Sequence, residues 1–450
     1  MMNTAGTATK ERLKTLVTDR NGTTYPAENQ PFSPHFYYEA PCFDLDTAKV
    51  SHKMLGFGIS LTDASCYLIS KLDDEQRKQL IHDIFAPDGL NLSIVRLNVG
   101  ASDYATEVYS YNDVPDDIEM KHFSIAHDEA YIIPLTKEVK AARNDLFLFS
   151  SPWSPPGWMK TGGEMCGGEM RHKYLPAFAN YYVEYLKAYR AHGLEIDAVT
   201  MQNEVDTDQN GTMPQSRLHP DFEMELCGYL MPPRLEAAGL NTKIWLYDHN
   251  YINWKRVMYM LSDPEVEKHV DAVAWHPYCG QPDMLRQVRE AHPGLPFQLT
   301  EKGPNIKPNS AEQHPLWWAK TISGALNNGC SSFVGWNCAL DENGNPNTGT
   351  FECAGLVEIH SQTGAITPSV QYHAFKHFAP YIKRGAELLH CYTNKDLTQD
   401  VTCVVCRNPD QSYVAVLSNS APVPQTVQFK RNGEYLRVLI RPEALVTITF

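Results

Sequence analysis

The chain has 450 residues, more than one hydrophobic core usually serves, so a large domain with a smaller second one is expected. Hydrophobic residues make up 43% of the chain and charged residues only 20%, which argues against long disordered regions. The formal net charge of −14 argues against nucleic acids and anionic membrane surfaces as partners, because both require basic protein surface.

Residues 1–18 are polar and charged and lack the apolar stretch of a secretory signal. No run approaches the roughly 18 apolar residues that a membrane-spanning helix requires. The 11 cysteines are odd in number and dispersed, which is typical of a reducing compartment. We therefore expect a cytoplasmic protein without integral membrane association. Export by a route that needs no leader stays open, and nothing in the sequence predicts the oligomeric state.

A short apolar run, usually followed by a helical stretch, recurs about eight times from residue 51 onward. The runs are continuous rather than alternating, as expected of parallel strands buried on both faces. Eight strand–helix units favour a closed (β/α)8 barrel over a doubly wound open sheet. The open sheet normally carries a glycine-rich phosphate loop, and Gly56-Phe57-Gly58 lacks its third glycine. The runs are Leu55–Asp63, Leu90–Val99, Leu146–Trp153, Ile196–Glu204, Thr242–Asn250, Val270–Tyr278, Pro296–Glu301 and Ser331–Leu340.

After about residue 380 the sequence changes to short segments rich in β-branched residues and separated by turn residues. This pattern predicts a small antiparallel β-sandwich domain attached to the barrel. Residues 1–50 hold little helical periodicity and are expected to contribute strands to it. The predicted domains are therefore an N-terminal β segment at 1–50, a catalytic barrel at 51–379 and a β-sandwich at 380–450.

Two glutamates, Glu204 and Glu301, each close one of the apolar runs, so they are predicted to lie on the same rim of the barrel. Two carboxylates on one rim can divide the acid and nucleophile roles of glycoside cleavage. Glu301 would attack the anomeric carbon. Glu204 would protonate the leaving oxygen, which requires a raised pKa, and would then act as base toward water.

The other strand ends carry carboxylates, amides and aromatic residues, a set that suits an uncharged, polyhydroxylated ligand. Arg96 is expected to keep Glu301 ionised, and His276 and Tyr278 to orient it. Asn203 precedes Glu204, so both can face the ligand only if the strand end is irregular. Predicted substrate contacts are made by Asp103, Trp153, Asn203, His276, Tyr278 and Trp336.

The segment Ser151-Pro152-Trp153-Ser154-Pro155-Pro156-Gly157-Trp158-Met159-Lys160-Thr161 is similar to a long, specific motif of glycoside hydrolase family 30, the family of lysosomal glucosylceramidase. Shorter matches in the same order extend the resemblance over nearly the whole chain. They are Gly56-Phe57-Gly58 with Thr62-Asp63, Asp103 after Arg96, Gln202-Asn203-Glu204, Asp248-His249-Asn250, Thr300-Glu301, and Gly335-Trp336-Asn337 followed by Asn345-Pro346-Asn347.

The resemblance implies a (β/α)8 barrel with an attached β-sandwich and retention of the anomeric configuration. It also implies that Glu204 is the acid/base and Glu301 the nucleophile. Asp103, Trp153, Asn203 and Trp336 match positions that hold the sugar. Four positions depart from the family pattern: Ile59, Val205, Pro277 and Lys302. We expect all four to border the pocket and to affect substrate preference rather than chemistry.

The predicted function is therefore a retaining, exo-acting β-glycosidase, most simply a β-glucosidase that resembles glucosylceramidases and acts on a small β-glycoside or a glycolipid. A β-xylosidase, β-fucosidase or β-1,6-glucanase specificity on the same fold is the first alternative. A carbohydrate-binding protein without catalysis is an alternative of another class, and a metal-dependent hydrolase a weaker one. Asp248, His249 and His276 lack close ligand spacing, so no metal and no cofactor is expected.

Overall fold

The computed structural model describes residues 13–19, 22–27 and 31–450, so the parts of the N-terminal predictions that fall on residues 1–12, 20–21 and 28–30 lie outside the described residues. The chain divides into two compact units. One spans residues 54–380, and the other joins the residues up to 53 with 381–450. The division falls a few residues from the expected boundaries, because strand β3 (Cys42–Lys53) runs through residue 50.

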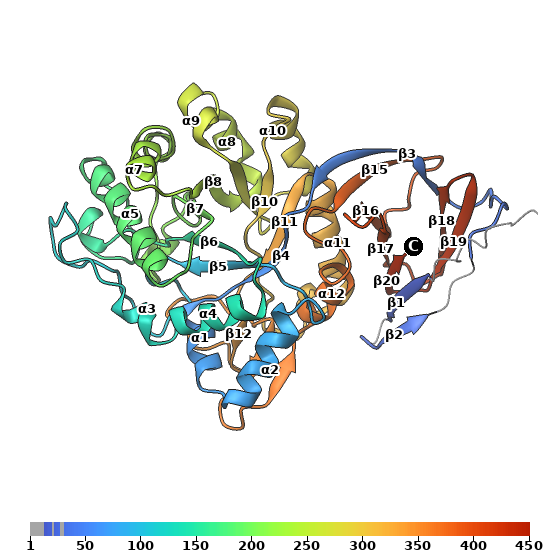
Figure 1. The fold of residues 1–450 in the computed structure, drawn as a ribbon, viewed down its shortest axis with the longest axis horizontal. Coiled ribbons are helices and arrows are strands. Elements are labelled where there is room, and N and C mark those ends of the chain that lie inside the picture. The colour runs from blue at the N-terminus through green and yellow to red at the C-terminus, as the bar shows by residue number, and fades with distance from the viewer. Residues whose placement is uncertain (1–12, 20–21, 28–30) are drawn as a thin grey trace, which may run out of the picture. The chain divides into compact units, whose positions relative to one another are not determined.

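The larger unit is a closed barrel of eight parallel strands in the order β10-β11-β4-β5-β6-β7-β8-β9, which confirms the predicted fold class (Figure 1). Each predicted apolar run coincides with one barrel strand, although β11 begins at Cys330, one residue before its run. The strands are nearly fully buried because helices cover the outside and side chains fill the inside. Their bounds are β4 (Gly56–Ser60), β5 (Ile94–Asn98), β6 (Phe147–Ser151), β7 (Ala198–Thr200), β8 (Lys243–Asn250), β9 (Ala272–His276), β10 (Phe297–Leu299) and β11 (Cys330–Gly335).

Helices follow the strands around the barrel. Asp74–Phe85 is a helix capped by the Asp73 side chain, which accepts from the amide of Gln76. The helices are α1 (Asp63–Ser70), α2 (Asp74–Phe85), α3 (Ala126–Ala130), α4 (Ile132–Ala142), α5 (Leu175–Ala191), α6 (Pro220–Met224), α7 (Met231–Ala237), α8 (Trp254–Met260), α9 (Pro264–His269), α10 (Leu285–Ala291), α11 (Pro315–Asn327) and α12 (Val370–Phe378). None of the helices in the described residues has both the length and the apolar character needed to cross a membrane.

The helical segment at 220–237 is interrupted. A π-helical turn, Glu225–Leu230, separates α6 from α7. Pro232 and Pro233 are tolerated because they lie in the first turn of α7. Backbone amides in a first turn have no acceptor within their own helix, so proline's missing amide hydrogen costs little there. Near the carboxyl end of the barrel, the long segment after β11 adds a small sheet of β12 (Ala339–Leu340), β13 (Val357–Ile359) and β14 (Ile366–Pro368).

The smaller unit is a nine-stranded sheet in the order β19-β18-β3-β15-β16-β17-β20-β1-β2, antiparallel except where β18 pairs with β3. Phe429 on β18 and Phe450 after β20 lie 5.6 Å apart between ring centroids although four strands separate β18 from β20. The sheet is therefore curled over one apolar core, as in a sandwich. The strands not yet bounded are β1 (Lys14–Thr18), β2 (Thr24–Ala27), β15 (Glu387–Thr393), β16 (Val401–Arg407), β17 (Tyr413–Asn419), β18 (Gln425–Arg431), β19 (Glu434–Ile440) and β20 (Ala444–Thr449).

Two glycines make the first barrel strand possible. A Cβ atom at Gly58 would lie 2.6 Å from the Cβ of Ile94 on β5, and one at Gly335 on β11 would lie 2.6 Å from the Cδ1 of Ile59. Ile59, one of the departures from the family pattern, is fully buried and fills the space that Gly335 leaves open. The departure at Ile59 is therefore a matter of packing between neighbouring strands.

Gly58→Ala is expected to destabilise the barrel by about 1–3 kcal/mol, since the added methyl group overpacks the contact between β4 and β5. Denaturant unfolding with a fluorescence readout measures the change. Gly294→Ala is the matched control, because a Cβ atom there meets nothing within 4 Å. Equal midpoints for the two variants would contradict this account of Gly58.

Candidate active site

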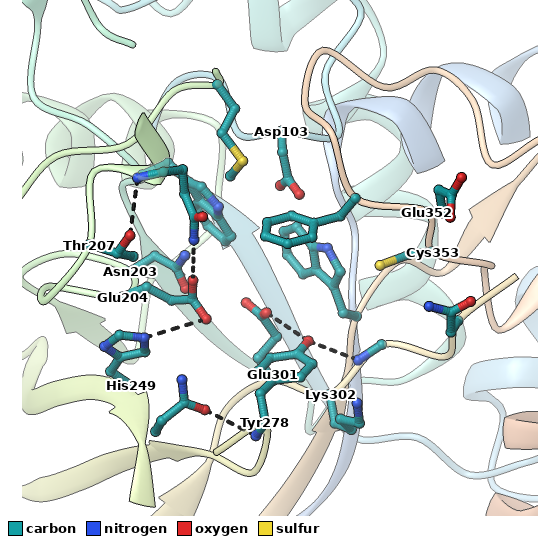
Figure 2. A pocket seen from close by; sticks show the side chains of 18 of the residues that line it. Asp103, Asn203, Glu204, Thr207, His249, Tyr278, Glu301, Lys302, Glu352 and Cys353 are labelled. Carbon is teal, nitrogen blue, oxygen red and sulfur yellow. Dashed lines mark hydrogen bonds and ion pairs between the residues drawn. The ribbon is translucent and has the colours of Figure 1, made fainter. Parts of the chain in front are cut away.

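A cavity of about 410 Å³ opens at the carboxyl ends of the barrel strands. Glu204 lies beyond β7 and Glu301 beyond β10, and Figure 2 shows their carboxylates turned towards each other. One carboxylate oxygen of each and the Nδ1 of His276 lie within 4.8 Å of one another. Of the predicted site residues, those that line the cavity are Asp103, Trp153, Asn203, Glu204, Tyr278, Glu301 and Trp336.

Arg96 lies beneath the cavity and is completely buried on β5. One guanidinium nitrogen, Nη1, is 2.5 Å from Oε2 of Glu301. The other, Nη2, donates to Oδ2 of Asp248 at 2.7 Å and to Oδ1 of Asn203 at 2.9 Å. The rings of Trp153 and Trp336 lie 4.8 Å and 5.6 Å from the guanidinium carbon. One cation thus contacts the proposed nucleophile and four of the residues around it.

Glu301 has a separate partner for each oxygen. Arg96 holds Oε2, and the Tyr278 hydroxyl donates to Oε1 at 2.9 Å. Its side chain is only 7% exposed, so these two donors replace most of its solvation. The contacts that the sequence predicted for Arg96 and Tyr278 toward Glu301 are both present.

Glu204 reaches the cavity because the chain breaks its strand pattern there. Strand β7 ends at Thr200, and Glu204 has a left-handed backbone with φ of 49°. Its amide donates to the carbonyl of Asp248. The irregularity lets Asn203 and Glu204 both line the cavity, as the sequence analysis required.

The protonation expected of Glu204 is not the one that the structure supports. Burial alone would raise its pKa, but a hydrogen bond with Nδ1 of His276 at 3.3 Å and the charges of His249, His276 and Arg96 lower it below its usual range. The prediction of a raised pKa was wrong for the unliganded protein. The cause is a set of basic side chains that lie near this carboxylate, on β5, on β8 and at the end of β9.

His276 carries the proton instead. Burial would lower its pKa, but the nearby charges of Glu301 and Asp248 and its bonds to Asp248 and Glu204 raise it to about 9. Its Nε2 lies 3.0 Å from Oδ1 of Asp248. At neutral pH the proton therefore lies one hydrogen bond away from Glu204, and the two residues titrate as a pair.

Three residues meet the geometric requirement for a metal site, namely Glu204, His276 and Glu301. Because His276 is protonated at neutral pH, its Nδ1 has no lone pair to offer a metal. The alternative set of Asp248, His249 and His276 does not converge, since the Nδ1 of His249 faces Asp206 at 3.3 Å. A metal ion at Glu204, His276 and Glu301 would therefore have to displace the proton of His276.

Asp103 and two tryptophans form a second wall of the cavity. Trp153 and Trp336 are stacked with ring centroids 4.8 Å apart. Asp103 is 4% exposed, and its Oδ1 has no hydrogen-bond partner in the structure. Burial and the charges of Glu301 and Glu204 raise its pKa well above the usual range. A buried carboxyl oxygen without a partner beside flat aromatic faces is suited to bind a hydroxyl group of a sugar.

The structure adds residues that the sequence analysis did not assign to the site. Asp248 accepts from Arg96, Ser151, Thr200, His276 and Thr300. Gln209 donates to Glu204 at 3.2 Å. The run Asp248-His249-Asn250 at a strand end was a signal for Asp248, but nothing marked Gln209, which begins a short 3₁₀ helix between β7 and α6.

The four departures from the family pattern are not all at the cavity. Lys302 lines it, whereas Ile59, Val205 and Pro277 do not. Val205 is buried, with 1% exposure, and Ile59 packs against Gly335. The expectation that all four border the pocket was wrong, because three of them contribute to packing or to the backbone path around it.

Comparison with known proteins agrees with this architecture. The family model for the glycosyl hydrolase family 30 TIM-barrel domain matches residues 54–382. The chain belongs to glycoside hydrolase family 30. This family 30 chain is therefore a glycosidase.

Among its relatives, an endo-1,6-β-D-glucanase of Neurospora crassa is 31% identical over 87% of this chain and 84% of its own length. A putative glucosylceramidase 4 of Caenorhabditis elegans is 28% identical over 99% of this chain and 90% of its own. The fold of SrfJ from Salmonella typhimurium matches with a TM-score of 0.90 at 21% identity, covering 97% of this chain and 99% of that one.

Arg96→Met is expected to lower the free energy of unfolding by about 3–5 kcal/mol, because it leaves the buried Asp248 carboxylate without its cation. Denaturant unfolding measures the loss. Arg286→Met, at an exposed position on α10, is the control and should change stability by less than about 0.5 kcal/mol. A loss no larger than the control's would contradict the dependence of Asp248 on Arg96.

The alkaline limb of kcat/KM for an aryl β-glycoside is expected near pH 9, since below that pH the Glu204–His276 pair holds one proton and above it none. In His276→Asn the proton must reside on Glu204 alone, so the limb should move to lower pH by about one unit or more. A pH profile of initial rates tests this. An unmoved limb in His276→Asn would show that His276 does not hold the relevant proton.

Proposed function

We propose that the protein is a retaining β-glycosidase that hydrolyses β-glucosides by double displacement. The proposal rests on the closeness of the carboxylates of Glu204 and Glu301, whose oxygens lie within 4.8 Å across the cavity. Retaining glycosidases hold their two carboxyl groups about 5–5.5 Å apart, whereas inverting enzymes leave room for a water molecule at about 6.5–9.5 Å.

In the first step, Glu301 attacks the anomeric carbon while the glycosidic bond breaks. The leaving oxygen takes from Glu204 the proton that His276 has passed to it through their hydrogen bond, so Glu204 is left ionised and His276 neutral. In the second step, Glu204 removes a proton from water, the resulting oxygen attacks the same carbon, and Glu301 leaves as a carboxylate. Asp103, Trp153, Asn203 and Trp336 would hold the sugar during both steps.

A sugar is the aglycone that best suits the remainder of the cavity. Beyond the proposed sugar contacts, its large apolar lining residues are Met213, Pro304 and Phe351. The two hydrocarbon chains of a ceramide would bury far more apolar surface than these supply. We therefore favour β-linked glucan, and β-1,6-glucan in particular because of the relative in Neurospora crassa. The polar and charged residues of this part are Thr207, Gln209, His249, Asn250, Lys302, Asn305, Glu312 and Glu352.

Glucosylceramide is the second candidate substrate. It is supported by the relative in Caenorhabditis elegans, which aligns with 99% of this chain. Side-by-side rates on β-1,6-glucan and on glucosylceramide in detergent micelles separate the two. Release of glucose alone from the glucan would indicate exo action, as the sequence analysis expects, and release of oligosaccharides would indicate endo action.

Glu301→Gln should lower kcat on an aryl β-glucoside by on the order of 10⁴-fold or more, because an amide cannot form the glycosyl-enzyme. Glu204→Gln should slow substrates with poor leaving groups by roughly 10²–10⁴-fold and activated ones much less in the first step. Steady-state kinetics on a leaving-group series measures both.

Unchanged rates in both variants would refute the assignment of the two glutamates. Binding of glucosides by the wild-type protein in calorimetry, with no hydrolysis after long incubation, would instead indicate a carbohydrate-binding protein. Azide rescue of Glu204→Gln, but not of Glu301→Gln on the same face, would further separate the two roles.

A further inference from the structure

Lys302 follows Glu301 directly and is the departure from the family pattern that lines the cavity. Its backbone is fixed, since its carbonyl accepts from the amide of Trp336 at 3.1 Å and from Nε2 of Gln371 at 2.9 Å. Its side chain is only 5% exposed. A lysine this deeply buried requires an explanation, because burying an ammonium group is costly unless partners replace its water.

The ammonium group has three such partners. It lies 2.7 Å from Oε1 of Glu312, 4.3 Å from the ring centroid of Tyr278 and 5.2 Å from that of Trp317. The second oxygen of Glu312 accepts from the amide of Asn305 at 2.7 Å. Lys302 is thus held between two aromatic faces by a carboxylate that is itself fixed.

Tyr278 is the partner that connects this cluster to the chemistry. Its hydroxyl donates to Oε1 of Glu301 and accepts from the amide of Gly303 at 3.0 Å. Tyr278 lies beyond the end of β9 and is 38% exposed, so its strand does not fix the ring. The ammonium group of Lys302 at the ring face supplies a fixed contact (Figure 2).

We propose that Lys302, held by Glu312, is a positioning residue that keeps the Tyr278 hydroxyl on Glu301 and thereby speeds release of the glycosyl-enzyme. The inference rests on the proposed function. In the intermediate Glu301 is an ester, and in the second step it must leave as a carboxylate while water adds to the anomeric carbon. A hydroxyl donor fixed at Oε1 stabilises that carboxylate as it forms.

The charge of Lys302 acts in the same direction as its position. Burial and the charge of Glu301 raise the pKa of the Tyr278 hydroxyl well above its usual range, so it stays a hydrogen-bond donor. A cation at the ring face polarises the O–H bond and strengthens that donor. The effect is largest where water is excluded, as it is around this side chain. Lys302 touches neither of the two glutamates by any described contact, so its influence on the reaction passes through Tyr278.

The test uses a 2,4-dinitrophenyl β-glycoside, whose leaving group is so good that the second step limits kcat. Lys302→Met keeps the unbranched side chain to within one atom of its length and removes the charge. We expect kcat to fall about tenfold and KM to fall in proportion, with kcat/KM within about twofold, because kcat/KM reports the first step. The burst of dinitrophenolate should stay near one equivalent per active site while the steady-state rate after it falls.

Three further variants distinguish positioning from general disruption. Lys302→Arg should recover most of kcat, since it restores the cation. Lys302→Met in a Tyr278→Phe background should change kcat by less than about twofold, because the hydroxyl through which it acts is gone. Lys320→Met, which removes an exposed charge on α11, is the matched control and should leave kcat unchanged.

Glu312→Gln gives an independent reading in case Lys302→Met folds poorly, because it keeps an acceptor for Asn305 and frees the ammonium group. It should show the same joint fall of kcat and KM, by about two- to fivefold. A fall in kcat/KM equal to the fall in kcat, or a full effect of Lys302→Met without the Tyr278 hydroxyl, would overturn the inference. Absence of aryl glycoside hydrolysis by the wild type would instead overturn the proposed function.

Discussion

The guanidinium group of Arg96 is the interaction around which the site is organised. It is completely buried at the bottom of the cavity, so its charge must be balanced by protein groups, and Asp248 and Glu301 provide that balance. Asp248 in turn fixes hydroxyls on three neighbouring segments, at Ser151, Thr200 and Thr300. A buried ion pair of this kind contributes little net stability, but here it ties four strand ends to one geometry.

The charges in the cavity explain where its protons reside. Four carboxyl groups (Glu204, Glu301, Asp248 and Asp103) share the space with the cations Arg96 and His276. Asp248 and Glu301 have direct contacts with Arg96, and Glu204 has His276. Asp103 has no cation of its own, and its pKa is the one that rises. A sugar entering this cavity therefore meets a nucleophile paired with Arg96, a proton held beside the acid/base residue, and a carboxyl group that favours its neutral form.

The sequence predicted the barrel well because parallel strands buried on both faces leave continuous apolar runs, and Leu90–Val99 or Thr242–Asn250 could hardly be anything else. It also predicted which residues reach the rim, since chemistry in such barrels lies at the strand ends. It failed for the pKa of Glu204, which depends on where His276 and His249 point. It also failed for Ile59, Val205 and Pro277, because a departure in sequence does not reveal whether a side chain faces the ligand or the packing between strands.

Lys302 shows why it matters whether a departure in sequence faces the ligand or the packing between strands. Its neighbours Glu312 and Trp317 come from a turn and a helix that follow it by ten residues or more, and no spacing rule brings them back to the nucleophile. In the fold, Lys302 is one link in a chain of contacts that ends at the carboxylate of Glu301. The chain starts at Asn305 and passes through Glu312, Lys302 and Tyr278.

The two steps of double displacement make opposite demands on the Glu301 carboxylate. The first step needs it to be nucleophilic, and the second needs it to be stable as it leaves. A cation that acts only through a tyrosine hydroxyl can adjust this balance without touching the sugar, so a chain of this family can change the rate of one step while its sugar contacts stay the same.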